Sequence, residues 1–189
     1  MQINEIDSTK NLMQNVKQRF FAMRNGVVAD VLRKAGSTYR IIFGLNLPQL
    51  KEIAVVFGYN TALAVELWEN DSTRESRLLA PMVVDPETVS KETIMNWIDT
   101  LSGNSEEIDM LCHSLLRKTP FVETLIEELR CSEATTHRYL VLRLAFGLSR
   151  ENPIGMKALA EAEISRADKA TLTVARQLLD ECEFILGNY

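Results

Sequence analysis

Apolar residues recur at helical spacing along most of the chain. In the first such segment Leu12, Val16 and Phe20 lie four residues apart, with Met23 three further on, so one helix face carries them all. Short breaks containing Gly, Asn, Ser or Pro end each segment, and the same pattern then resumes. The pattern predicts helices over residues 9–23, 26–35, 48–57, 61–69, 72–84, 88–101, 104–119, 121–130, 133–149, 153–163 and 166–186.

Two segments depart from this regular pattern. Residues 37–47 have a composition that suits a strand, but no partner strand exists for them, so we expect a connection packed under its neighbours. The helix predicted over residues 72–84 begins with Ser72 and Glu75, the spacing of a capping box. Pro81 lies inside that helix and is expected to bend it, because proline removes a backbone donor.

The short breaks indicate how the helices pack. Neighbouring helices joined by only a few residues lie antiparallel, and none of these helices can bury its apolar face alone. We therefore predict an all-α, HEAT-like helical-repeat solenoid, an alpha-alpha superhelix of antiparallel helix pairs forming a single domain over residues 1–189. A globular helical bundle is the alternative, since the repeats have no fixed period.

Composition limits the class of protein and the compartment that we expect. Apolar content is 46% and charged content 25%, and no apolar run is long enough for a membrane span. The first residues are polar and acidic, unlike a signal peptide. The chain has 3 cysteines, an odd number without a Cys-x-x-Cys pair, which favours a reducing compartment and a cytoplasmic protein.

Charge is distributed unevenly along the chain. The net charge is −5, yet between Lys10 and Lys51 the only acidic residue is Asp30, against eight basic ones, so this segment carries +7 and the remainder −12. Such asymmetry indicates either an acidic partner for the basic segment or neutralisation within the molecule.

No cofactor is expected. Cys112 and His113 are adjacent, so on a helix they point in different directions, and no second Cys/His pair has ligand spacing. A glycine-rich phosphate loop is also absent. We therefore predict no metal and no nucleotide cofactor.

Three stretches carry a resemblance to a known family. They are the run from Phe43 to Ala54 with Gly44 and Pro48, the Leu67-Trp68 pair, and Arg74-Glu75 followed by Ala80. In order and spacing they resemble the DNA alkylation repair family, the AlkD-like glycosylases. The resemblance implies a solenoid of HEAT-like repeats that cradles duplex DNA on a concave basic face and removes alkylated purines.

The resemblance also implies site residues. The family's Trp-Trp-Asp-x-x-Asp stretch corresponds to residues 104–109, where Asp109 takes the last acidic position, Glu106 takes another, and both tryptophans are missing. A carboxylate there stabilises the sugar cation, and an arginine holds the neighbouring phosphate. The family's Trp-x-x-Arg setting, again without its tryptophan, places this arginine at Arg138. We thus predict Asp109 as catalytic, assisted by Glu106, and as phosphate-binding residues Arg138, Arg143, Lys17, Arg24, Arg33, Lys34 and Arg40.

Each of these residues has a simpler interpretation. Asp109 can be an exposed acid on an ordinary helix, and Arg138 can form a surface ion pair with Glu133 or Glu161. Trp97 either replaces a lost aromatic or belongs to the core.

The function predicted from the resemblance is binding of alkylated double-stranded DNA with excision of cationic purines. The alternative is a catalytically inactive HEAT-repeat scaffold for a protein partner.

Overall fold

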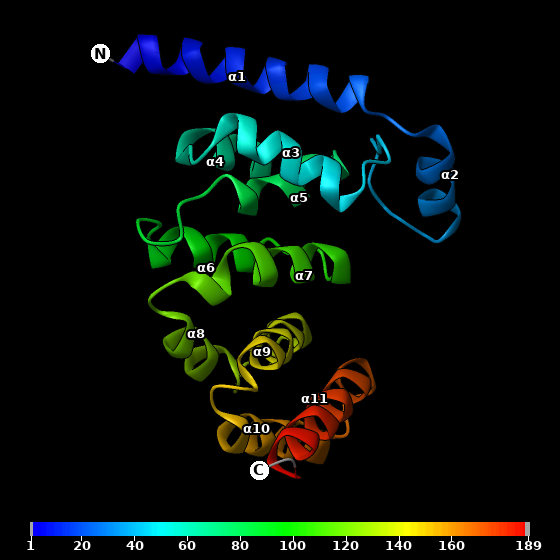
Figure 1. Ribbon diagram of the computed structural model, residues 1–189, viewed down its shortest axis with the longest axis vertical. Coiled ribbons are helices and arrows are strands. Elements are labelled where there is room, and N and C mark those ends of the chain that lie inside the picture. Colours follow the sequence, from blue (N-terminus) through cyan, green and yellow to red (C-terminus); the bar gives the residue numbers. More distant parts are fainter. Residues whose placement is uncertain (1, 188–189) are drawn as a thin grey trace. The chain divides into compact units, whose positions relative to one another are not determined.

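The protein consists of two compact helical units. The computed structural model describes residues 2–187, and side chains from residue 11 onward. One unit extends to Val89 and the other begins at Ser90. Within the described residues all regular structure is helical, apart from an isolated bridge between Ile41 and Thr73 (Figure 1). The single domain over residues 1–189 stays a prediction.

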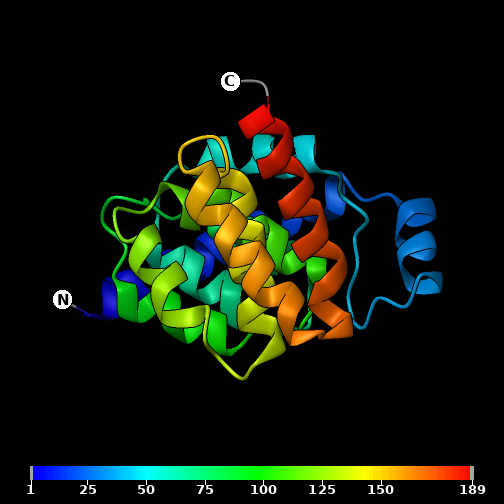
Figure 2. The ribbon, with the colours of Figure 1, turned by 90° about the horizontal axis from the view of Figure 1, so that it is seen from below.

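The first unit has a helix at each predicted place, although α1 begins at Gln2 rather than at residue 9 and the helix predicted over residues 72–84 is shorter. Helix α4 has the predicted bounds, and the stretch between α2 and α3 is a connection, as expected from its missing partner strand. Helix α2 stands at the edge of this unit, joined to it by irregular segments on both sides (Figure 2). The elements are α1 (Gln2–Ala22), α2 (Gly26–Lys34), α3 (Leu47–Phe57), α4 (Thr61–Glu69), α5 (Arg74–Leu79) and the 3-10 turn η1 (Ala80–Met82).

The expected capping box at Ser72 is wrong. The N-cap of α5 is Thr73, and no side chain caps this helix. Glu75 is fully buried and turns away from the helix start toward the connection before α3. The helix also stops at Leu79, and Pro81 lies in the 3-10 turn that follows rather than bending a continuous helix.

The Glu75 carboxylate instead organises the connection. It accepts hydrogen bonds from the backbone N–H groups of Phe43 (2.9 Å), Gly44 (2.9 Å) and Leu45 (3.3 Å). Arg74 donates from Nη1 to the same carboxylate at 2.8 Å and to the carbonyl oxygen of Leu45 at 3.1 Å. Because these groups are buried, the hydrogen bonds offset the cost of removing the two charges from water.

Gly44 is required where this connection passes α2. Its φ is +78°, a left-handed conformation that favours glycine. A Cβ at this position would lie 2.2 Å from the carbonyl oxygen of Asn25 and 2.9 Å from the backbone nitrogen of Ala29. No side chain fits there without moving the start of α2.

Trp68 and Arg77 form a further buried contact within the first unit. Both are buried; the Arg77 guanidinium lies 3.8 Å from the centre of the Trp68 ring and donates to the Trp68 carbonyl oxygen at 2.8 Å. Together with Gly44 and Glu75, these residues belong to the stretches that carried the family resemblance. In this structure Gly44 and Glu75 determine the path of the connection between α2 and α3, and Trp68 and Arg77 join α4 to α5.

The second unit is a series of paired helices. Helices α10 and α11 pack side by side, and both contact α9, which also contacts α7 and α8 (Figure 2). No helix in the described part of the chain is long and apolar enough to cross a membrane. The elements are α6 (Lys91–Asp99), α7 (Ser105–Ser114), the 3-10 turn η2 (Leu116–Lys118), α8 (Val122–Leu129), α9 (Thr135–Leu148), α10 (Pro153–Arg166) and α11 (Lys169–Gly187).

Asparagine side chains begin two of these helices. Asn104 caps α7 by accepting from the Glu106 N–H at 3.0 Å, and Asn152 caps α10 by accepting from the Gly155 N–H at 3.0 Å. Trp97 on α6 is only 4% exposed and lies in the core, so it does not replace a missing site aromatic.

Candidate nucleic-acid interface

Two of the predicted site residues meet between α7 and α9. Arg143 donates from Nε to Oδ1 of Asp109 at 2.5 Å. The two side chains keep 31% and 41% of their surfaces exposed, so the pair is open to solvent. Among the described residues, Arg143 has no other polar partner, and its two Nη groups remain available.

This ion pair lies in a pocket of about 130 Å³ within the second unit. Helix α7 and the turn η2 supply one wall, and α9 supplies the other. One carboxylate residue, Asp109, and two arginines, Arg117 and Arg143, thus line the same small pocket. The lining residues are Asp109, Cys112, His113, Arg117, Arg143, Leu144, Phe146 and Gly147.

Arg117 and Phe146 were missed from the sequence. Within the helix predicted over residues 104–119, Arg117 lies eight residues or about two turns after Asp109, although in the structure α7 ends at Ser114 and Arg117 lies in η2. Phe146 lies three residues or about one turn after Arg143. Helical spacing from the two predicted residues would have pointed to both. Phe146 keeps 37% of its surface exposed and is the aromatic residue in the lining.

The buried thiol of Cys112 reports the electrostatics of the pocket. Burial raises its pKa, and the negative charge of Asp109 raises the pKa further. The positive charges of Arg143 and Arg117 lower the pKa of the same thiol. Cys112 therefore stays protonated and unreactive. Asp109, Arg143 and Arg117 all shift the pKa of this one thiol, so their charges lie near one another.

Glu106 is not part of the pocket formed by the described residues. It lies in the first turn of α7, one turn before Asp109, where the helix dipole stabilises an acidic side chain. Its assisting catalytic role stays a prediction.

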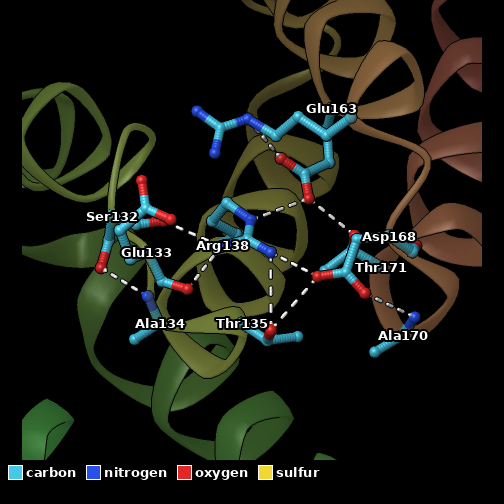
Figure 3. Close-up of polar contacts among 10 residues, drawn as sticks. Ser132, Glu133, Ala134, Thr135, Arg138, Glu163, Asp168, Ala170 and Thr171 are labelled. Carbon is cyan, nitrogen blue, oxygen red and sulfur yellow. Dashed lines mark hydrogen bonds and ion pairs between the residues drawn. The ribbon is translucent and has the colours of Figure 1, made fainter.

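Arg138 occupies a different environment from the one predicted. It is buried on α9, and its guanidinium lies at the centre of a network that joins the segment before α9 to α10 and α11 (Figure 3). Nε donates to Glu163 at 3.0 Å, and Nη1 donates to the carbonyl oxygens of Ser132 (2.9 Å) and Glu133 (2.8 Å). Nη2 donates to Thr135 at 3.4 Å and to Asp168.

These contacts use all five N–H donors of Arg138. Burial opposes its charge, but the hydrogen bond and charge of Glu163, with those of Asp168, raise the pKa of the guanidinium. The surface ion pair with Glu133 or Glu161 is wrong, because the acidic partners are Glu163 and Asp168. Phosphate binding by Arg138 stays a prediction, but a phosphate would have to displace one of these protein acceptors.

The five predicted cations of the first unit are all exposed. Arg33 pairs with Asp30 at 3.1 Å, and the Arg24 guanidinium lies 3.9 Å from the centre of the Phe21 ring. Among residues with described side chains, Lys17, Lys34 and Arg40 have no acidic partner. Phosphate binding stays a prediction for Lys17, Arg24, Arg33, Lys34 and Arg40.

The side chains described contain no group of three or more His, Cys, Asp or Glu residues placed to hold a metal ion. Cys112 and Cys182 are buried and Cys131 is exposed, and all three are free thiols.

Comparison with known proteins identifies the fold. A model of the DNA alkylation repair enzyme family matches residues 16–185. A solved structure superimposes with a TM-score of 0.71 at 15% sequence identity, covering 88% of this chain and 73% of that one. It is described as belonging to a new family of proteins related to the HEAT-like repeat DNA glycosylases, with affinity for branched DNA structures. A search of curated proteins gave no match. The predicted HEAT-like helical-repeat fold is confirmed.

Proposed function

The chain belongs to the DNA alkylation repair enzyme family, and from this premise we propose that it binds DNA at the pocket of Asp109 and Arg143 and excises cationic alkylated purines there. The observation that carries the proposal is the solvent-open ion pair of these two residues in a pocket between α7 and α9. It supplies a carboxylate for the sugar and a guanidinium for the adjacent phosphate.

The chemistry requires little from the protein at the base. A purine alkylated on a ring nitrogen is already cationic, so the C1′–N bond breaks with its electron pair going to the purine, which leaves neutral. The sugar becomes a cation, which the Asp109 carboxylate stabilises. Water then adds to C1′ and loses a proton, which Asp109 can accept.

Arg143 has a double role in this proposal. Its Nε fixes the orientation of the Asp109 carboxylate, and its Nη groups face a phosphate, with which guanidinium forms paired hydrogen bonds. Phe146 contributes an aromatic face in the place of the missing tryptophans, since such faces attract cations. For the first unit, taken by itself, the proposal is that the exposed cations Lys17, Arg24, Arg33, Lys34 and Arg40 bind DNA phosphates.

The test is the salt dependence of DNA affinity. Duplex and branched DNA should both be used, because the similar structure belongs to a family with affinity for branched DNA. Each phosphate neutralised releases counterions, so affinity should fall steeply as salt rises. Arg143→Gln should weaken binding about tenfold and lower the salt slope by about one.

Arg150→Gln is the matched control. Arg150 is exposed, lies two residues after the end of α9 and does not line the pocket, so its loss should change affinity less than about twofold. Affinity that is independent of salt, or equal effects of the two substitutions, would contradict the proposal.

A further inference from the structure

We propose that Arg117 is a phosphate ligand, and that Arg117 and Arg143 together hold one phosphodiester of the bound DNA. The inference deepens the proposed function and rests on it. It concerns a residue outside the predicted set of phosphate ligands.

Arg117 lies against the same face of α9 as Arg143. A Cβ on Gly147 would lie 3.6 Å from Cδ and 3.7 Å from Nη1 of Arg117, so the side chain of Arg117 extends along α9 at that point. Gly147 follows Arg143 by one helical turn, which places the two on one face of α9. Both arginines line the same pocket. Their guanidinium groups therefore border one space.

The charge of Arg117 is not neutralised inside the protein. Among residues 11–187 no carboxylate pairs with it, and its one polar contact runs from Nη2 to Nε2 of His113 at 3.5 Å. Asp109 is the acid of the pocket and is already paired with Arg143. Two guanidinium groups thus face a single carboxylate, which leaves the pocket with an excess positive charge.

A phosphodiester suits this arrangement. It carries one negative charge on two non-bridging oxygens, and each oxygen can accept from one of the two guanidinium groups. Asp109 then lies beside the sugar that adjoins this phosphate, where the proposed excision needs a carboxylate. Arg117 would position the nucleotide without touching the reacting atoms.

The experiment compares Arg117→Gln with Lys118→Gln in the full chain. The two residues are adjacent in η2, both are exposed and both lose one positive charge, but only Arg117 lines the pocket. With duplex DNA carrying one alkylated purine, Arg117→Gln should weaken binding about tenfold and lower the salt slope by about one. Lys118→Gln should weaken binding by less than about twofold. Equal unfolding midpoints of the variants would confirm that folding is not the cause.

Equal loss of affinity in the two variants would overturn the inference while leaving DNA binding intact. Absence of DNA binding by the native chain would overturn the proposed function with it. Inorganic phosphate, compared with chloride at matched ionic strength, distinguishes the source of the phosphate. Binding of inorganic phosphate by the native chain together with unchanged DNA affinity in Arg117→Gln would assign the site to free phosphate and overturn the inference.

Discussion

Arg143 on α9 donates to the carboxylate of Asp109 on α7, and the two side chains face the same solvent-open pocket. Residues 34 positions apart are brought together because α7 and α9 pack directly. Arg138, five residues before Arg143, points away from this pocket and forms ion pairs with Glu163 and Asp168. The arginine next to the candidate catalytic acid is therefore Arg143.

The Arg138 network should govern stability rather than DNA affinity. Arg138→Ala removes the nearer of the two arginines from the buried carboxylate of Glu163. That carboxylate keeps Thr171 at 2.6 Å and Arg166 at 3.6 Å, so the cost should be about 3 kcal/mol, the lower end for breaking a buried ion pair. Urea unfolding should show this, while Arg176→Ala, an exposed residue on α11, should cost less than about 0.5 kcal/mol. Unchanged stability with weakened DNA binding in Arg138→Ala would instead make Arg138 a phosphate ligand.

Gly44 and Gly36 provide a paired test of the first unit. Both have positive φ, but a Cβ at Gly36 meets nothing within 4 Å, whereas one at Gly44 meets the backbone of α2. Gly36→Ala should cost about 1 to 2 kcal/mol from backbone strain alone. Gly44→Ala should cost at least about 2 kcal/mol more, because overpacking adds to the strain. Equal thermal shifts would show that the close approach to Asn25 is not limiting.

Asp168 should make stability depend on acidic pH. The backbone N–H of Ala170 lowers its pKa below the usual 3.8, and the side chains of Thr135 and Arg138 lower it further against the opposing effect of burial. A folded pKa below the unfolded one gives stability that is present above pH 3.8 and is lost as pH falls through the folded pKa. Asp168→Asn should be less stable at neutral pH and should depend less on pH below 3.8. Parallel curves of unfolding free energy for the two proteins would contradict this.

The helical fold could be predicted from sequence because it depends on local signals. Apolar spacing, asparagine caps and short breaks determine helices such as α4 and α10, and these signals lie within a few residues of one another. The capping box failed for the opposite reason. Glu75 has the right spacing for Ser72, but the backbone of residues 43–45 offers it more hydrogen bonds, and no local pattern shows that competition.

The site was predictable only in part. Asp109 and Arg143 were named from sequence, yet their pairing depends on how α7 packs against α9. The Trp-x-x-Arg setting points to Arg138 as the family's arginine, but its acidic partners, Glu163 and Asp168, lie 25 and 30 residues away in the chain, so no local pattern shows that they bury it. Which of two arginines on one helix faces the pocket follows from tertiary packing.

Phe146 should matter for excision more than for binding. Phe146→Leu keeps an apolar side chain but removes the aromatic face, so excision of a cationic purine should slow about fivefold, the value of roughly 1 kcal/mol of cation–π attraction. DNA affinity should stay within about twofold, because phosphates dominate binding. Phe184→Leu, at a largely exposed position on α11, is the matched control. Equal excision rates in the native protein and Phe146→Leu would show that no aromatic face is used.

The most direct test of the account is the release of 3- or 7-methylpurine from methylated duplex DNA under single-turnover conditions. The native protein should release the base, and Asp109→Asn should do so at least about 100-fold more slowly while binding DNA with similar affinity. Asp180→Asn, at an exposed position on α11, should match the native rate. Equal release by the native protein and Asp109→Asn, or no release by the native protein, would contradict the assignment of Asp109 as the catalytic carboxylate.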